Sequence, residues 1–123
     1  DGSLTTLHAN SPRDALSRME TMVLMSGMDL PVRAIREQVS SAVDIIVQQS
    51  RLSDGSRRVT HISEVLGMEV DIITLADIFV FKQSGVAKDG TVKGELKPTG
   101  LVPRFYQELK DRGLPVDMSI FSD

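Results

Sequence analysis

The sequence of 123 residues predicts a small α/β domain in which helices are followed by an antiparallel meander. In two segments near the N-terminus, apolar residues recur every three or four positions, which is typical of amphipathic helices. From about residue 45 they alternate with polar residues instead, and Asp54-Gly55 lies between two such runs as a tight hairpin turn. The composition, 41% apolar and 25% charged, is that of a single globular domain.

Residues 2–9 are rich in threonine and leucine, and we expect them to form a short strand. A helix should follow, because Ser11 suits its N-cap and Pro12 its first turn. Asp14, three residues past the cap, strengthens this prediction of a helix start. Gly27 is expected to end the helix.

A second helix is predicted from Pro31 to about residue 43, and its inner face is expected to hold Ile35, Val39, Ala42 and Val43. The apolar period changes near residue 44, from helical to strand-like. Residues 45–52 and 58–65 are therefore predicted to form two antiparallel strands on either side of the hairpin turn.

Gly67 is expected to reverse the chain again before a third strand over residues 71–81. Both faces of this strand are mostly apolar, so it should be central and covered on both sides. Residues 83–90 predict a polar loop, and residues 91–97 alternate like an exposed edge strand.

The last part of the chain predicts a short helix over residues 104–112, opened by a proline and closed by Gly113. The tail that follows carries Ile120 and Phe121, and we expect it to dock on the body of the domain. Residues 82–123 hold seven basic and six acidic residues, which indicates a solvated face rather than a run of like charge.

Composition and charge exclude several classes of protein. With 14 basic and 17 acidic residues the formal net charge is −3, which argues against a nucleic-acid partner. The absence of cysteine excludes disulfides, thiolate metal sites and a cysteine nucleophile, and it favours a reducing, cytoplasmic location. The longest apolar run, residues 22–25, is far too short to span a bilayer, and no signal peptide is expected.

Thr6, His8 and Asn10 cluster where the predicted first strand gives way to a helix. Ligands bind at this edge of open α/β sheets, and the free N–H groups of a helix N-terminus attract anions. A histidine in this place is suited to contact a phosphate. The alternative is that Ser11 only caps the helix and that His8 is structural, and the spacing leaves both interpretations open.

Other chemistry has weaker support in the sequence. No Gly-Lys-Ser or Gly-Lys-Thr occurs, so the chain contains no P-loop and we expect no nucleotide site of its own. His8 and His61 are far apart in the sequence and lack companions at ligand spacing, so no metal site is expected. A triad of Ser3, His8 and Asp14 can be assembled on paper, but no nucleophile-elbow pattern supports it.

Asp71 and Asp77 flank the third strand and are candidates for a pair of facing carboxylates. The alternative is that Asp71 ends a turn while Asp77 pairs with a base such as Arg58. Arg58 also belongs, with Arg51 and Arg57, to a basic group around the hairpin turn. These arginines either bind a phosphate or an acidic partner, or they keep the hairpin tip soluble.

A methionine-rich ridge follows the first predicted helix. Its members are Met19, Met22, Met25 and Met28. We expect core filling to explain it, and the alternative is a deformable interface for a partner protein.

The run TTLHANSPRDALSRMETMVLMSG resembles the C-terminal part of the CpaF-like secretion ATPases of Flp/Tad pilus systems, members of the type II/IV secretion ATPase superfamily. The resemblance continues through DIITLADIFVFKQSG and KPTGLVPRFYQELKDRG, so it covers essentially the whole chain. The order and spacing of these pieces make it specific.

The resemblance implies the C-terminal portion of a RecA-like P-loop ATPase domain that works as a hexamer at the inner membrane. Thr6-Leu7-His8-Ala9-Asn10 matches the His box of the family, which makes His8 the catalytic residue that senses the nucleotide, with Thr6 and Asn10 beside it. Residues 1–43 then end the RecA-like core, and residues 44–123 form the meander and final helix of the same domain.

The motifs that hold ATP and Mg²⁺ in this family precede the His box, and this sequence does not contain them. We therefore expect a fragment that is inactive alone, whose full-length parent uses ATP and Mg²⁺ and meets an inner-membrane pilus platform protein. The location is expected to be cytoplasmic, peripheral to the inner membrane. The alternative is a non-catalytic interaction or oligomerisation module that pairs through residues 2–9.

Overall fold

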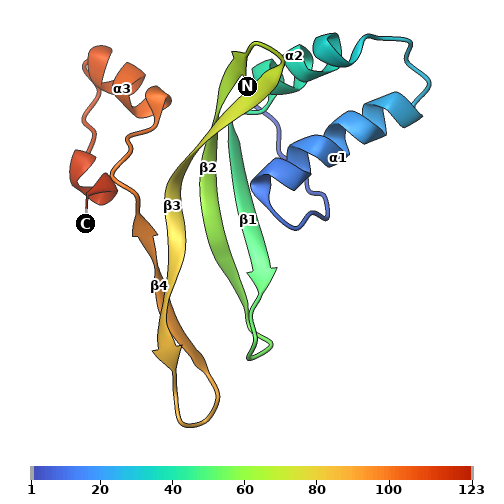
Figure 1. Cartoon of the computed structure of the whole chain (residues 1–123). Coiled ribbons are helices and arrows are strands. Elements are labelled where there is room, and N and C mark those ends of the chain that lie inside the picture. Colours follow the sequence, from blue (N-terminus) through green and yellow to red (C-terminus); the bar gives the residue numbers. More distant parts are fainter. Residues whose placement is uncertain (1, 123) are drawn as a thin grey trace.

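A twisted four-stranded antiparallel sheet forms the centre of the computed structural model, which describes residues 2–122 (Figure 1). The strands are β1 (Ile45–Arg51), β2 (Arg57–Glu69), β3 (Ile72–Val86) and β4 (Val92–Pro98). Each strand pairs with the one before it in the sequence, so the predicted meander is confirmed. The hairpin turn at Asp54-Gly55 is confirmed as well, and its glycine has a φ of 85°.

Helices lie on both sides of one half of the sheet, as Figure 1 shows. On one side are α1 (Pro12–Met25) and α2 (Val32–Ala42). On the other are α3 (Arg104–Asp111) and the short 3-10 helix η1 (Met118–Phe121). The chain is therefore a mixed helix-and-sheet domain in which two helices precede the antiparallel strands, as predicted.

The main apolar core lies between the sheet and the pair α1 and α2. Its buried members are Leu16, Ile35, Val39, Ile46, Val65 and Ile73. Ile35 on α2 is the most deeply buried of them, with 1% of its surface exposed. Burying a side chain of this size contributes about 1.5–3 kcal/mol, so apolar burial holds these helices on the sheet. The predicted inner face of the second helix is confirmed for Ile35, Val39 and Val43, whereas Ala42 is exposed and its predicted place on that face is wrong.

The C-terminal tail covers the opposite face through aromatic contacts. The ring of Phe121 is buried, with its centroid 5.9 Å from that of Phe79 on β3 and 4.6 Å from that of Tyr106 on α3. The predicted docking of the tail is confirmed for Phe121, whereas its neighbour Ile120 stays exposed. This half of β3 is covered on both sides, as we expect of a central strand.

Local hydrogen bonds fix the start of α1. The Ser11 hydroxyl accepts from the backbone N–H of Asp14 at 3.0 Å, and Pro12 occupies the first turn. The Asp14 carboxylate accepts in return from the backbone N–H of Asn10 at 2.9 Å. The predicted cap is confirmed, and the helix ends before Gly27, whose φ is 83°.

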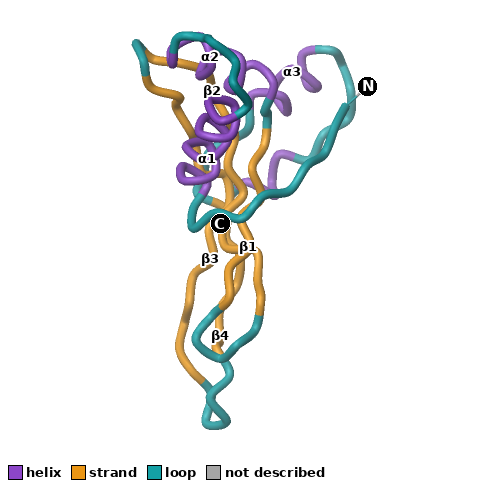
Figure 2. The backbone as a smooth tube through the Cα atoms, turned by 90° about the vertical axis from the view of Figure 1, so that its right-hand side faces the viewer, coloured by secondary structure: helices purple, strands orange, loops and turns teal. Residues whose placement is uncertain are grey.

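Residues 2–9 do not form the strand that their composition predicts. They contain neither helix nor strand (Figure 2). Most of these residues are exposed. A strand needs a hydrogen-bonded neighbour, and within the described chain β1 pairs only with β2. The prediction is wrong because composition reports only β-propensity, whereas pairing depends on the tertiary structure.

The reversal predicted at Gly67 is also wrong. Gly67 lies inside β2 with a φ of 123°, and the pairing register slips there by one residue, leaving Leu66 as the extra one. The chain turns instead at Val70, whose φ is 57°. A glycine inside an apolar strand marks a bulge as readily as a turn, and only the paired strand distinguishes the two.

The polar loop predicted over residues 83–90 is shorter than expected, because β3 continues to Val86. Its polar end pairs with β4, which satisfies backbone groups that a loop would leave to water. The edge strand predicted over residues 91–97 is confirmed as β4.

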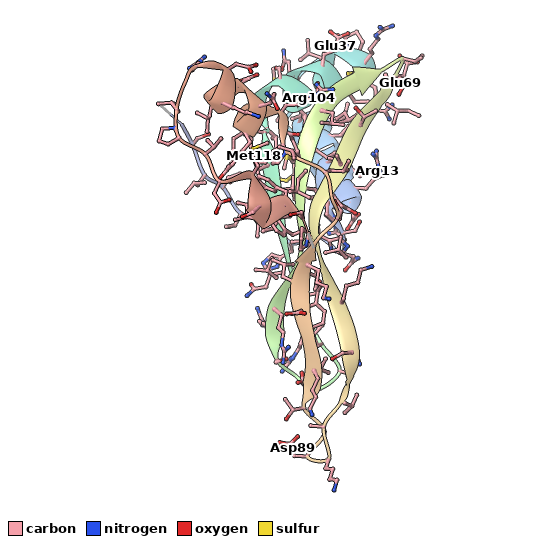
Figure 3. The ribbon with its side chains drawn as sticks, turned by 90° about the vertical axis from the view of Figure 1, so that its left-hand side faces the viewer. Arg13, Glu37, Glu69, Asp89, Arg104 and Met118 are labelled. Carbon is pink, nitrogen blue, oxygen red and sulfur yellow. The ribbon has the colours of Figure 1, made fainter. Side chains whose placement is uncertain are left out.

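The other half of the sheet projects beyond the helices as two hairpins (Figures 1 and 3). We define residues 51–58 and 81–97 as the hairpin arm. Within it, the guanidinium carbon of Arg58 lies 5.5 Å from the centroid of the Phe81 ring. Gly94 makes room for this ring, since a Cβ there would lie 2.6 Å from its Cζ atom.

Val92 joins the two hairpins of the arm. It pairs with Val86 across the second hairpin and is 1% exposed. Its N–H donates to Asp54 Oδ2 at 2.8 Å, and its carbonyl accepts from Arg58 Nη2 at 2.7 Å. Two side chains of the first hairpin thus occupy backbone groups that an edge strand would otherwise leave open.

Candidate functional site

The segment with the predicted site residues leads directly into α1 (Figure 2). Thr6, His8 and Asn10 are all exposed. Within residues 2–122, none of these three side chains takes part in a hydrogen bond or ion pair, and only the backbone N–H of Asn10 is engaged. The structure therefore places them on one exposed segment beside a capped helix N-terminus, without bringing them together in an enclosed site.

A buried glutamine holds the backbone of this segment against the sheet. Gln48 of β1 is 7% exposed, and its Nε2 donates to the carbonyl of Ala9 at 3.0 Å and to that of Gln49 at 3.3 Å. Ala9 directly follows His8, so the main chain is fixed while the imidazole beside it stays exposed. Sequence reasoning missed Gln48, whose one signal is its spacing of two from the inward-facing Ile46.

Asp14 serves the start of the helix. The backbone N–H of Asn10 lowers the pKa of the Asp14 carboxyl, and the Arg18 guanidinium, 2.9 Å away, lowers it further. In the part of the chain that the structure describes, this carboxylate forms no hydrogen bond or ion pair with His8 or Ser3. The triad that the sequence allows is therefore not formed.

Asp71 and Asp77 do not face each other as a pair. Asp77 Oδ1 accepts from the Ser63 hydroxyl at 2.6 Å, and Asp71 Oδ1 lies 3.6 Å from Arg33 Nη1. Along a strand their six-residue separation corresponds to about 20 Å. The expected contact of Asp77 with Arg58 is also wrong, since Arg58 binds a backbone carbonyl of β4.

Glu64 is a buried carboxylate that sequence reasoning missed. It lies on β2 with 6% of its surface exposed, and both its oxygens accept from the backbone N–H of Arg104, at 3.0 and 2.9 Å. It caps α3, whose own N-cap residue, Pro103, offers no side-chain acceptor. The Arg104 guanidinium, labelled in Figure 3, donates to the carbonyl of Leu66 at 2.8 Å and strengthens this junction.

A cavity of about 410 Å³ lies at this junction. Asp44, Glu64, Arg104 and Glu108 supply its charged lining. Among the described residues, no three histidine, aspartate or glutamate side chains are placed to hold a metal ion. Glu64 is already hydrogen-bonded to α3, so the charged side chains around this cavity serve to hold the tail on the sheet. The one hint of this in the sequence is a helix that starts at Pro103 without a capping side chain.

A smaller cavity, about 230 Å³, lies where α1, α2 and β3 meet. Arg36 of α2 binds the two carboxylate oxygens of Glu20 at 3.2 and 3.3 Å and donates to the carbonyl of Asp71 at 2.9 Å. Arg13 of α1 donates to the carbonyl of Ile73 at 2.8 Å. Both arginines therefore join helices to the start of β3.

The methionine ridge is divided by the structure. Met19 packs against the core, whereas Met22, Met25 and Met28 expose 60, 81 and 52% of their surfaces. Core filling is therefore the wrong explanation for these three. A spacing of three residues turns each successive side chain back by about 60° around a helix, so Met22 and Met25 leave the face that Met19 occupies, and Met28 lies beyond the end of α1.

No protein-family model matches this chain, and no curated protein matches it. Among residues 2–122, no helix combines the length and apolar content needed to cross a bilayer. The exposed His8 segment, held by Gln48 at the start of α1, remains the candidate site of the described residues.

Proposed function

We propose that this chain is the C-terminal part of a hexameric, RecA-like ATPase that powers Flp/Tad pilus assembly or type II/IV secretion. The observation that supports the proposal is the placement of His8. Its side chain is exposed beside the capped N-terminus of α1, while Gln48 holds the next carbonyl of the chain. An exposed ring on a fixed backbone is suited to contact a ligand that other residues bind, and to pass a displacement on to β1.

The residues of this chain do not form a nucleotide site by themselves. The sequence contains no Gly-Lys-Ser or Gly-Lys-Thr loop, and the described acidic residues assemble no metal site. The proposal therefore assigns the phosphate cradle and the Mg²⁺-holding carboxylates to residues beyond those printed here. It gives His8 a sensing role, with Thr6 and Asn10 beside it.

In this proposal, residues 1–43 end the RecA-like core, and residues 44–123 form the meander and final helix of the same domain. The partners are other copies of the enzyme and a pilus platform protein of the inner membrane, on its cytoplasmic side.

The first test is to read the open reading frame upstream of Asp1. A continuous frame that encodes a Gly-Lys-Ser/Thr loop and an acidic strand supports the proposal. A start codon immediately before Asp1 would contradict it and favour a module without catalysis.

The second test changes His8 to Ala in the full-length enzyme. We expect kcat to fall by about 100-fold, as for the loss of one transition-state donor, with nucleotide affinity nearly unchanged. His61→Ala is the matched control, because the one hydrogen bond of that ring within the described residues is with the neighbouring Thr60 hydroxyl, at 3.0 Å. Parental turnover in His8→Ala would make His8 a structural residue.

The third test uses the chain alone. Because it lacks a phosphate cradle, it should bind no Mg-ATP in a calorimetric titration. Micromolar binding would show a nucleotide site within these residues and would overturn the assignment.

A second candidate function is an oligomerisation module without catalysis. The exposed Met22, Met25 and Met28 favour it, as does the unpaired segment of residues 2–9 with its exposed Leu4. This candidate requires a stable homo-oligomer in light scattering at micromolar concentration. A folded monomer under the same conditions would exclude it.

A further inference from the structure

The hairpin arm is basic, although the whole chain is acidic. The arm holds seven of the 14 basic residues but only three of the 17 acidic ones, a local net charge of +4 in a chain of −3. The basic residues are Arg51, Arg57, Arg58, Lys82, Lys88, Lys93 and Lys97. The molecule is therefore strongly polarised along its length, since the arm projects from one end (Figure 3).

Four of these basic side chains are available to a partner. Arg57, Lys82, Lys88 and Lys93 are exposed, and within residues 2–122 they form no ion pair or hydrogen bond through their side chains. Two of the acidic residues of the arm are already engaged. Asp54 accepts from the N–H groups of Ser56 and Val92, and Asp89 accepts from the N–H of Thr91 at 3.0 Å.

The arm carries its charge well away from the acidic body. The Phe79 ring on β3 contacts Phe121 of the C-terminal tail, and the strand continues to Val86, about 23 Å further at the usual rise per residue. This is more than twice the Debye length at physiological salt, about 8 Å. At this distance salt therefore screens the negative charge of the body, and a partner at the tip interacts mainly with the positive charge of the arm.

The tip also has a fixed shape. Asp54 and Arg58 hold both backbone groups of Val92, so two hydrogen bonds join the hairpins to each other. Val86 lies between Lys82 and Lys88 in the sequence and exposes 58% of its surface. An apolar side chain flanked by lysines at a projecting tip is typical of protein segments that rest on lipid head groups.

We propose that the hairpin arm binds the surface of a bilayer that contains anionic phospholipids. Basic side chains spread over two hairpin tips, without a cavity between them among those described above, match a delocalised negative surface better than a single acidic peptide. Single-stranded nucleic acid fits less well, because its bases stack on exposed aromatic rings. The one aromatic residue of the arm, Phe81, is covered by Arg58.

The expected effect of each basic residue follows from its attraction to the surface potential. A lysine or arginine close to an anionic leaflet strengthens binding by about fivefold. Removing two of them, Lys88→Gln and Lys93→Gln, should weaken binding by about 25-fold. Both side chains are exposed, so this double variant should remain folded.

The experiment is a vesicle co-sedimentation assay with the chain itself. It compares vesicles of phosphatidylcholine alone with vesicles containing about one third phosphatidylglycerol, at low and at high salt. The matched control is the double variant Lys110→Gln and Arg112→Gln, which removes the same charge from an exposed part of α3 and its C-cap. The circular dichroism spectrum of each variant reports whether it is folded.

We expect the parent chain and the α3 control to bind the anionic vesicles equally, and the arm variant to lose binding. High salt should weaken binding of the parent, and phosphatidylcholine alone should not bind it. An equal loss of vesicle binding in both double variants would overturn the proposal. Binding that does not depend on the charge of the lipid would overturn it as well. Retention on polyglutamate or single-stranded DNA without binding to vesicles would also overturn it, and would identify the other class of partner. None of these readouts depends on ATP hydrolysis, so the proposed function is tested separately.

Discussion

The helical body and the hairpin arm share one sheet, but different interactions hold them together. In the body, buried side chains such as Ile35 and Val65 pack between the sheet and two helices. In the arm, Asp54 and Arg58 bind the backbone of Val92, and the Phe81 ring lies over Gly94. The body therefore depends on apolar volume, whereas the arm depends on precise geometry at a few positions. Removing side-chain atoms should therefore destabilise the body, whereas adding an atom should destabilise the arm.

The largest effect is expected from Ile35→Ala, which tests the dependence of the body on volume. Ile35 is 1% exposed, so truncation leaves a cavity and should lower the free energy of unfolding by about 2–5 kcal/mol in urea titrations. Ile72→Ala is the control, because Ile72 is 60% exposed, and it should cost far less. Equal costs for the two variants would contradict an apolar origin of the body's stability.

Gly94→Ala tests the geometry of the arm. The added Cβ would lie 2.5 Å from the Lys82 carbonyl oxygen and 2.6 Å from the Phe81 ring. The carbonyl belongs to the backbone of a paired strand, so it cannot easily move away. We expect a loss of about 1–3 kcal/mol, with faster hydrogen exchange confined to β3 and β4 of the arm. Gly85→Ala, whose Cβ would meet no atom within 4 Å, should behave like the parent chain. Exchange that accelerates mainly in the helices would refute the separation of arm and body.

Glu64→Gln tests a part of the body that is held by a polar contact instead of apolar burial. The glutamine keeps one oxygen acceptor for the Arg104 N–H but loses the charge and the second acceptor, so stability should fall by about 1 kcal/mol. The loss should appear as faster hydrogen exchange in α3. The control is Glu108→Gln, an exposed change on α3 itself, which should have almost no effect.

The smallest effect is expected from the acid titration of Asp54. The Ser56 hydroxyl, with the N–H groups of Val92 and Ser56, lowers the pKa of Asp54 from 3.8 to about 2. Since the folded pKa lies below the unfolded one, the stabilisation is fully present above pH 3.8 and is lost as the pH falls towards 2. The melting temperature of the parent chain should therefore exceed that of Asp54→Asn at pH 6, and the gap should close near pH 2. A gap that stays constant over this range would show that the charge of Asp54 does not stabilise the arm.

Much of the fold follows from local signals in the sequence. Ser11, Gly27 and the Asp54-Gly55 turn predicted element boundaries correctly, because caps and turns are decided by a few neighbouring residues. The predictions for Gly67 and for residues 2–9 are wrong for one shared reason. In each case, the outcome depends on whether a partner strand lies alongside, and the local sequence carries no information about that.

Less of the candidate site follows from the sequence. The position before a helix predicts Thr6, His8 and Asn10 as a candidate site, but the side chain that anchors this segment, Gln48, is 39 residues away from Ala9. Glu64 likewise acts on a residue 40 positions away. Such contacts are specified by the packing of the sheet, and spacing along the chain does not reveal them.

The order of the strands has a consequence for how the protein is made. Because β1 to β4 lie side by side in the order of their synthesis, each new strand finds its neighbour already present, and only short loops must close. Assembly can then begin on the ribosome, from the first hairpin onward. The contact of Glu64 with α3 must wait until α3 has emerged, so we expect α3 to dock after the hairpin of β1 and β2 has formed.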